Sequence, residues 1–336
     1  MSRSRDDGSE YELGRRDFLT LGIGALAVAG LPVAARMRPT LVRRRIPVMG
    51  TVAEIAIPTR NEAWAQRAMD AAFSELRRVD RTMSRFRDDS DVGRLNAESG
   101  WVRLSQDTGT VLVASTRWAA RSTGRFDPCL GRASALWDVE HRRHPPAERE
   151  VEAFAHAELW QALEVETDDQ GARARLTSPD AAVDLGGIAK GFGVDKAAEA
   201  LRSFGVVNGL VNVGGDLVAL GTDLSGEPWR IGVRDPASPD GLAATLSASD
   251  EAVATSGDYL SYFRHGGRRY HHLLDPATGG PYVGYGRSLT VGAARCLDAD
   301  AAATALFAGG ETESARILGR APGDIRIIHD LMEATT

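Results

Sequence analysis

Asp300 and Thr304 are the two side chains best spaced to bind a hard cation. They stand four residues apart in the alanine-rich stretch 298–305, which is typical of a helix. On a helix this spacing puts both oxygens on one exposed face, and hard cations prefer such oxygen ligands. We expect Asp298, two residues earlier, to cap the start of this helix. The stretch therefore predicts a metal site built on one helix.

Lys190 lies in the glycine-rich segment 183–193, where an apolar strand end runs through paired glycines into a helix. It is one of only two lysines among 40 basic residues, the other being Lys196. A compact ammonium suits a site where the planar fork of arginine does not fit. Glycines let backbone approach a ligand, and the first amides of a helix attract an anion. The spacing matches neither a Rossmann turn nor a Walker A loop, and the alternative is a turn that only starts a helix.

Two adjacent histidines, His271 and His272, precede the turn-rich segment 273–281. Neighbours in an extended chain point to opposite faces, so only one of them can face a given pocket. A histidine that titrates near neutral pH could move a proton there; the alternative is a surface histidine or a hydrogen-bonded core histidine. Two more polar stretches, 212–216 and 254–259, could contact a ligand or form a plain strand bend and turn.

The first residues have the pattern of an export signal. Arg15 and Arg16 precede a weakly apolar run, rich in glycine and alanine, that ends at Leu31, as in a twin-arginine signal. About 14 apolar residues fall short of the roughly 20 that span a bilayer, which argues against an anchor helix. No Cys lies in this region, which excludes a lipid anchor. We expect residues 1–35 to be removed and the mature protein to be periplasmic or extracytoplasmic, without a stable membrane span.

Composition excludes several classes of protein. The 336 residues are 43% hydrophobic and 26% charged, as in a folded globular enzyme. A formal net charge of −6 gives no positive field for a phosphate backbone, so we expect no nucleic-acid partner. Two cysteines, Cys129 and Cys296, are too few for a disulfide scaffold and fit no zinc pattern. We expect both to be small buried side chains.

Residues 36–336 alternate helical and strand patterns without a visible internal repeat. Asn61 is placed to cap a long helix that ends near Val79, and residues 141–146 are expected to form an exposed loop. Further helices are expected at 112–121, 147–163, 189–204, 299–307 and 312–318, and strands at 52–57, 209–213, 217–220, 229–233, 288–293 and 325–329. This order predicts an α+β fold with mixed, partly antiparallel sheets flanked by helices. It forms one domain, 36–336, which could divide into two subdomains with the ligand site between them.

Taken in order, the motifs resemble the ApbE family of flavin transferases over residues 49–310. The resemblance is carried by segments 49–51, 84–86, 90–96, 124–128, 184–191, 212–216, 255–259, 272–281 and 299–304. Each segment is a weak signal alone, but the ordered set is specific. Cys129 and Gly280 depart from the family's pattern, which has Thr and an aromatic residue at these positions, and this bears on the shape of the pocket.

The resemblance implies an ApbE-like flavin transferase fold and a Mg²⁺-dependent FAD:protein FMN transferase. Such an enzyme splits FAD, releases AMP and joins FMN through a phosphodiester to a Thr hydroxyl of a target flavoprotein. By position, Asp300, Thr304 and the carbonyl of Gly187 would bind Mg²⁺, and His272 could act as general base. The residues that would line the FAD site are Met49, Phe126, Asp127, Asp184, Lys190 and Leu273.

Two other functions stay open at this point. The first is a metal-dependent FAD pyrophosphatase, which would use the same site with water as acceptor. The second is an exported flavin-binding protein without catalysis. The presence of Asp300, Thr304 and His272 together favours an enzyme, because a binding protein needs neither a metal face nor a base. The acceptor is another protein, so this chain cannot reveal its identity, and it does not reveal the oligomeric state.

Overall fold

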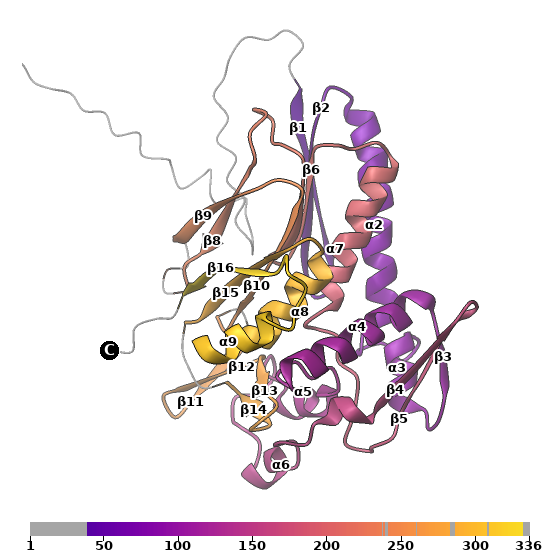
Figure 1. Cartoon of the computed structure of the whole chain (residues 1–336), viewed down its shortest axis with the longest axis vertical. Helices are drawn as coiled ribbons and strands as arrows, with labels where there is room; N and C mark the ends of the chain where they lie inside the picture. Colours follow the sequence, from indigo (N-terminus) through magenta and orange to yellow (C-terminus); the bar gives the residue numbers. More distant parts are fainter. Residues whose placement is uncertain are drawn as a thin grey trace, which may run out of the picture.

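A computed structural model of the chain describes residues 39–236, 238, 241–259, 261–282, 286–307 and 309–331. The expected signal peptide, residues 1–35, lies outside these ranges. Figure 1 shows one large twisted sheet with long helices along one face and smaller elements gathered at one end of it. The predicted α+β class is confirmed.

Every neighbouring pair of strands in the large sheet is antiparallel. In spatial order its strands are β1 (Thr40–Val48), β2 (Thr51–Thr59), β6 (Gly209–Val213), β7 (Asp216–Leu220), β10 (Glu251–Gly257), β15 (Ser288–Ala293) and β16 (Arg326–Leu331). The two-residue turn between β1 and β2 consists of Met49 and Gly50, both with positive φ (54° and 68°). This is the turn geometry that matches the twist of an antiparallel hairpin.

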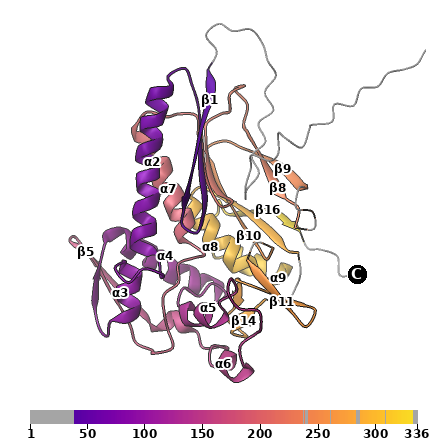
Figure 2. The ribbon, with the colours of Figure 1, turned by 180° about the vertical axis from the view of Figure 1, so that it is seen from behind.

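Three helices pack on one face of the sheet: α2 (Glu62–Met83), α7 (Ala189–Ser203) and α8 (Cys296–Phe307). As predicted, Asn61 caps α2, its side chain accepting a hydrogen bond from the Trp64 amide at 3.0 Å. Figures 1 and 2 show α2 and α7 side by side along this face. Alternate residues of β6 and β7, such as Val211 and Val218, point into the core that these helices cover.

The elements at the end of the sheet include α3 (Asp91–Ala97), α4 (Gln106–Ser122), α5 (Gly131–Trp137) and a small sheet with the order β3-β5-β4. These strands are β3 (Val102–Leu104), β5 (Gly171–Leu176) and β4 (Leu163–Asp168), and α9 (Glu311–Leu318) precedes β16. The single helix predicted for 147–163 is wrong. That segment forms α6 (Glu148–Glu152) and a 3-10 turn, η1 (Leu159–Ala162). His156 and Glu158 between them have positive φ (54° and 44°), which a right-handed helix cannot contain.

On the opposite face of the sheet lies the hairpin of β8 (Trp229–Arg234) and β9 (Leu242–Ala248). Trp229 and Ile231 of β8 pack against Leu217 and Val253 of the large sheet. Two shorter hairpins follow β10 in the chain, β11 (Tyr262–His265) with β12 (Arg268–His271), and β13 (Leu274–Asp275) with β14 (Gly280–Pro281). His272 lies between these two hairpins.

The other predicted helices and strands are found close to their expected bounds, except that the helix predicted at 112–121 begins earlier, at Gln106. Cys129 and Cys296 are buried, as expected, and the structure shows that they do not pair. Across the residues that the structure describes, no helix combines the length and the apolar character needed to cross a membrane.

Candidate functional site

The site forms where the first turn of α7 meets the middle of α8. The Gly191 amide donates a hydrogen bond to Asp300 Oδ2 at 3.0 Å. A Cβ on Gly191 would collide with the carbonyl of Cys296 and lie 2.9 Å from the Cβ of Asp300. Only glycine therefore lets the two helices come close enough for this contact.

Lys190 sits between two buried carboxylates. Its ammonium forms an ion pair with Asp216, the first residue of β7, and lies 3.4 Å from Asp300 Oδ1. Asp216 and Asp300 are only 1% and 2% exposed, so the ammonium is their main source of charge compensation. Burial lowers the pKa of Lys190, but the two carboxylates outweigh burial and raise this pKa above its ordinary value.

The pKa of Asp300 is raised to about 7, first by burial and then by the nearby charge of Asp216, while Lys190 lowers it. Its burial corrects the expectation that it stands on an exposed helix face. A raised pKa means that Asp300 holds its proton more tightly than an ordinary carboxyl does, so a bound metal ion would take the place of that proton.

The three expected metal ligands come together. Thr304 lies one turn after Asp300 on α8, and its Oγ1 is 3.5 Å from the carbonyl oxygen of Gly187. A Cβ on Gly187 would lie 2.8 Å from Thr304 Oγ1, so glycine is needed for this approach too. Within the described ranges, no three His, Cys, Asp or Glu side chains form a metal-binding cluster. The expected set contains one carboxylate, one hydroxyl and one carbonyl, which is an oxygen set of the kind that Mg²⁺ accepts when substrate phosphates and water complete it.

Asp298 does not cap α8, which begins two residues earlier at Cys296. Its carboxylate accepts a hydrogen bond from Trp118 Nε1 at 3.0 Å and pairs with Arg295 at 2.9 Å. The cap is supplied by Asp195 of α7, whose carboxylate accepts from the amides of Cys296 and Leu297 at 2.8 and 3.0 Å. The sequence pattern missed this cap because its residue lies on another helix.

Asp184 borders the site and lies in the segment 177–188, which joins β5 to α7. Its Oδ1 accepts from the Gly186 amide at 3.0 Å, and its Oδ2 lies 3.0 Å from Nε of Arg85. The Arg85 guanidinium also lies over the ring of Phe86, 4.1 Å from its centroid. Phe86 is 80% exposed, an unusual position for a large aromatic side chain. The pairing of Arg85 with Asp184 was not predicted.

Phe126 and Asp127 lie beside the same segment, since the Asp184 amide donates to the carbonyl of Pro128 at 2.8 Å. Phe126 is buried, and its ring edge would lie 3.3 Å from a Cβ on Gly187. The Asp127 carboxylate accepts from the amides of Cys129 and Trp160 at 2.8 and 3.2 Å. Burial raises the pKa of Asp127 to about 6 despite these bonds. This carboxylate therefore fixes the backbone of the segment.

Met49 and Leu273 supply apolar surface near these residues. The half-buried Met49 stands at the β1–β2 turn, and its sulfur would lie 3.2 Å from a Cβ on Gly193 of α7. Leu273 is half-buried and packs against the core formed around Phe126 and Phe192. The turn and the segment around Leu273 thus both add apolar contacts near the start of α7.

His271 and His272 face opposite ways, as predicted. His271 is buried, and its Nδ1 accepts from the Leu273 amide at 3.2 Å, which leaves Nε2 to donate to the carbonyl of Tyr282 at 3.1 Å. Burial lowers the pKa of His271 to about 4, so it is neutral and structural.

His272 is exposed, and its Nδ1 lies 3.4 Å from the carbonyl oxygen of Ser261. If this nitrogen carries the proton, Nε2 keeps a free lone pair. Desolvation by neighbouring protein atoms lowers the pKa of His272. The positive charge of Lys190 adds to this effect, and the negative charge of Asp184 opposes it. The ring therefore lies within electrostatic range of the ion-paired centre.

Sequence comparison agrees with this arrangement. The sequence model of the ApbE family matches residues 49–329. An FAD:protein FMN transferase of Treponema pallidum is 32% identical over 292 residues, covering 82% of this chain and 81% of the relative. One of Haemophilus influenzae is 29% identical over 309 residues, covering 89% of each.

Solved structures with the same fold are also known. The ApbE protein of Thermotoga maritima superimposes with a TM-score of 0.75 at 29% identity, covering 88% of this chain and 97% of that one. The flavin transferase ApbE of Vibrio cholerae gives a TM-score of 0.74 at 28% identity, covering 88% and 98%.

Proposed function

The chain belongs to the ApbE family, and from this premise we propose that it is an FAD:protein FMN transferase. In the finer form of the proposal, the reaction depends on Mg²⁺ and its acceptor is a Thr hydroxyl of a target flavoprotein. The oxygen of that hydroxyl attacks the FMN-side phosphorus of FAD. A phosphodiester to FMN forms, the bond to the AMP oxygen breaks, and AMP leaves.

One observation carries this proposal. Asp300, Thr304 and the Gly187 carbonyl meet beside Lys190, and His272 lies within electrostatic range of that lysine. Phosphoryl transfer needs positioning and charge neutralisation more than covalent chemistry by the protein. An oxygen set next to an ammonium and a neutral imidazole fits those needs.

Each group of side chains has its own role in the proposed reaction. Asp300, Thr304 and the Gly187 carbonyl would hold Mg²⁺, which when bound neutralises charge on the diphosphate. The ammonium of Lys190 would neutralise part of the same negative charge on the diphosphate. His272 accepts the proton of the attacking hydroxyl at Nε2, because its Nδ1 is directed at Ser261.

Flavin binding uses the surfaces around this centre. The exposed ring of Phe86 offers a face on which a planar group can stack, and Arg85 and Asp184 beside it offer polar contacts. Met49, Phe126 and Leu273 add apolar area. Asp127 keeps the segment of Phe126 in place through its backbone hydrogen bonds.

The test measures AMP and free FMN in parallel. The purified protein is incubated with FAD and Mg²⁺, with and without a candidate acceptor flavoprotein, and a chelator serves as control. A transferase releases AMP only with the acceptor and leaves little free FMN. Equal amounts of AMP and free FMN without an acceptor would identify a pyrophosphatase, and no AMP in any sample would identify a binding protein.

We also propose that the protein is exported by the twin-arginine route and acts outside the cytoplasm. The support is the pattern of Arg15 and Arg16 before a weakly apolar run. The acceptor would then be a protein with a domain exposed in that compartment.

A further inference from the structure

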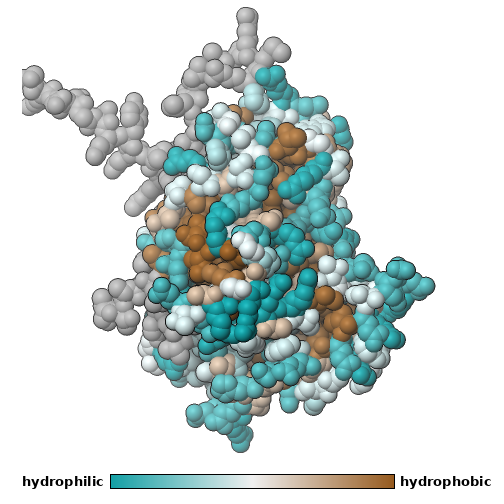
Figure 3. All heavy atoms as spheres, viewed as in Figure 1, coloured by the Kyte–Doolittle hydropathy of each residue, from teal (hydrophilic) through white to brown (hydrophobic). Residues whose placement is uncertain are grey.

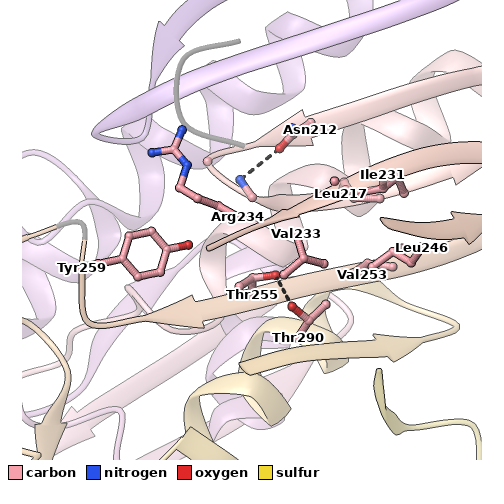
Figure 4. A pocket seen from close by; sticks show the side chains of 13 residues that line it. Asn212, Leu217, Ile231, Val233, Arg234, Leu246, Val253, Thr255, Tyr259 and Thr290 are labelled. Atoms are coloured by element: carbon pink, nitrogen blue, oxygen red, sulfur yellow. Dashed lines mark hydrogen bonds between the residues drawn. The ribbon is translucent and has the colours of Figure 1, made fainter. Parts of the chain in front are cut away.

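A hollow of about 590 Å³, its mouth included, lies on the β8–β9 side of the large sheet, across the sheet from α7 and α8. Its floor is apolar, formed by side chains such as Leu217, Val253 and Leu246. Polar groups gather at one end, where Figure 4 shows Arg234 and Tyr259 on the same side of the hollow. In Figure 3 apolar surface gathers on this face, bordered by hydrophilic residues. About 50 Å³ of this space is enclosed, which is room for one side chain and not for a whole ligand, whose sites measure about 300–1,000 Å³.

Arg234 has no acidic partner in the part of the chain that the structure describes, although it is only partly exposed. Most other arginines that line the folded surface pair with a carboxylate or stack on a ring, as Arg85 and Arg287 do. A half-buried guanidinium without a partner attracts an anionic group, and its planar fork fits a carboxylate. The hollow thus contains one positive charge, that of Arg234, with which an anionic group of a ligand could pair.

The edge of β8 also faces the hollow. Four consecutive residues, Ile231 to Arg234, line the hollow. Side chains of a strand alternate between its two faces, so a run of four indicates that the backbone of β8 lines the hollow as well. β8 pairs with β9 on one edge, and among the described strands none pairs with its other edge. A free strand edge with an apolar floor beside it is the arrangement to which an extended peptide can add.

Two chain segments join the hollow to the proposed active site near one end of the sheet. Gly215 lines the hollow, and the next residue, Asp216, pairs with Lys190 on the helical face. Tyr259 lines it too, and Ser261, two residues on, accepts a hydrogen bond from the His272 amide at 3.2 Å. Two residues span at most about 7 Å. A chain lying in the hollow could therefore bring a neighbouring hydroxyl to His272.

We propose that this hollow is the docking groove for an extended, acidic segment of the protein that accepts FMN. This inference rests on the proposed function, because it names the partner of that site. The segment adds to the free edge of β8, places an apolar side chain on the floor and directs an Asp or Glu carboxylate at Arg234. The acceptor Thr then lies outside the groove, on the His272 side.

The experiment uses an immobilised library of short peptides with a fixed central Thr and randomised flanks. Binding of the purified protein is measured first without FAD, and FMN attachment is measured afterwards with FAD and Mg²⁺. The variants are Arg234→Glu and the milder Arg234→Gln. Arg230→Glu is the matched control, because Arg230 lies on the same strand but is exposed and does not line the hollow. Melting temperatures verify that each variant is folded.

The wild-type protein and the Arg230→Glu control should retain peptides with an acidic residue at a fixed distance from Thr. Arg234→Gln should bind them about ten- to a hundredfold more weakly, since a charged hydrogen bond is lost. Arg234→Glu should prefer a basic residue at that position. Equal behaviour of Arg234→Glu and Arg230→Glu, or no retained peptide at all, would overturn the docking groove.

Other results separate the groove from the function. Acidic peptides that bind but never take up FMN would leave the groove standing and contradict the transferase. FMN attachment without any acidic preference would leave the transferase standing and overturn the groove. Self-association, or binding of inorganic phosphate, that depends on Arg234 in place of peptide binding would assign the hollow to another occupant.

Discussion

At the scale of single residues, the site depends on one ammonium shared by two buried carboxylates. Lys190 was singled out from the sequence because lysine is rare in this chain, and Asp300 because of its spacing from Thr304. Their pairing could not be predicted, since 110 residues separate them and only the packing of α7 on α8 brings them together. Asp216 lies in the polar stretch 212–216, which a plain strand bend explained equally well. The structure shows that Asp216 pairs with Lys190.

Removing this ammonium should destabilise the fold. Lys190→Ala leaves Asp216 and Asp300 buried without compensation, which should lower the free energy of unfolding by about 3 kcal/mol or more. Adding Asp216→Asn should restore part of the loss. Urea denaturation of both variants measures this. The other lysine is the control: Lys196 pairs with the exposed Glu199, so Lys196→Ala should cost about 1 kcal/mol or less. Equal losses for the two lysines would contradict the buried charge cluster.

His272 should matter for rate and His271 for stability. A general base contributes about 10²–10⁴-fold, so His272→Ala should reduce FMN transfer by that order while FAD affinity and melting temperature stay near normal. Because the pKa of His272 lies below its ordinary value, the ring is neutral at neutral pH, and the wild-type rate should decline only on the acid side. His271→Ala removes two buried hydrogen bonds and should lower the melting temperature. Near-normal transfer by a folded His272→Ala protein would contradict the assignment.

At the scale of elements, α8 is held in place by a cap from a neighbouring helix. Asp195 of α7 accepts from the first amides of α8, the helix that carries Asp300 and Thr304. Asp195→Ala leaves these amides without an acceptor and should cost about 1–2 kcal/mol. Asp195→Asn keeps an acceptor and should cost less, as measured by urea denaturation.

The same cap predicts a pH dependence. Burial raises the pKa of Asp195 to about 6 from an ordinary 3.8, so the folded protein holds this proton more tightly than the unfolded chain. Wild-type stability relative to Asp195→Asn should therefore rise as pH falls from above 6 towards 4. The contrary result is a wild-type free energy of unfolding that stays constant relative to Asp195→Asn over this range, or falls with acid. It would show that burial does not raise the pKa of Asp195.

Elements with a strong local pattern were predictable from the sequence. Asn61 and the apolar spacing behind it give α2, and the glycine pair before α7 marks its start. The helix predicted for 147–163 was wrong because its breaks depend on His156 and Glu158, which carry no proline or glycine signal. The stretch 254–259 was interpreted as a ligand contact or a plain turn, but Thr255 to Gly257 belong to strand β10, because they pair with β15.

At the scale of the whole molecule, one antiparallel sheet joins the motifs. They lie far apart in the chain and meet at one end of the sheet, on α7, α8, the β1–β2 turn and the hairpins around His272 (Figure 1). The sequence indicated this convergence only through resemblance to a family, because strand order in a sheet cannot be read from local patterns. The expected division into two subdomains stays a prediction.

Export is a property of the whole chain. Replacing Arg15 and Arg16 by Lys should leave the protein in the cytoplasm with residues 1–35 attached, because the twin-arginine pattern is lost. Cell fractionation with mass measurement of the N-terminus checks this. A single replacement elsewhere in the first residues, Arg5→Lys, is the control. Processing and export that persist without the arginine pair would assign another route.

The most direct test of the account is the intact mass of a candidate acceptor flavoprotein after incubation with this protein, FAD and Mg²⁺. The account predicts that the acceptor gains the mass of FMN less one water at a single Thr. The gain should disappear with a chelator, with Asp300→Asn, and with the acceptor Thr replaced by Ala. An acceptor that keeps its mass while FAD is cleaved, or that gains FMN equally well with the chelator and Asp300→Asn, would contradict Mg²⁺-dependent FMN transfer at this site.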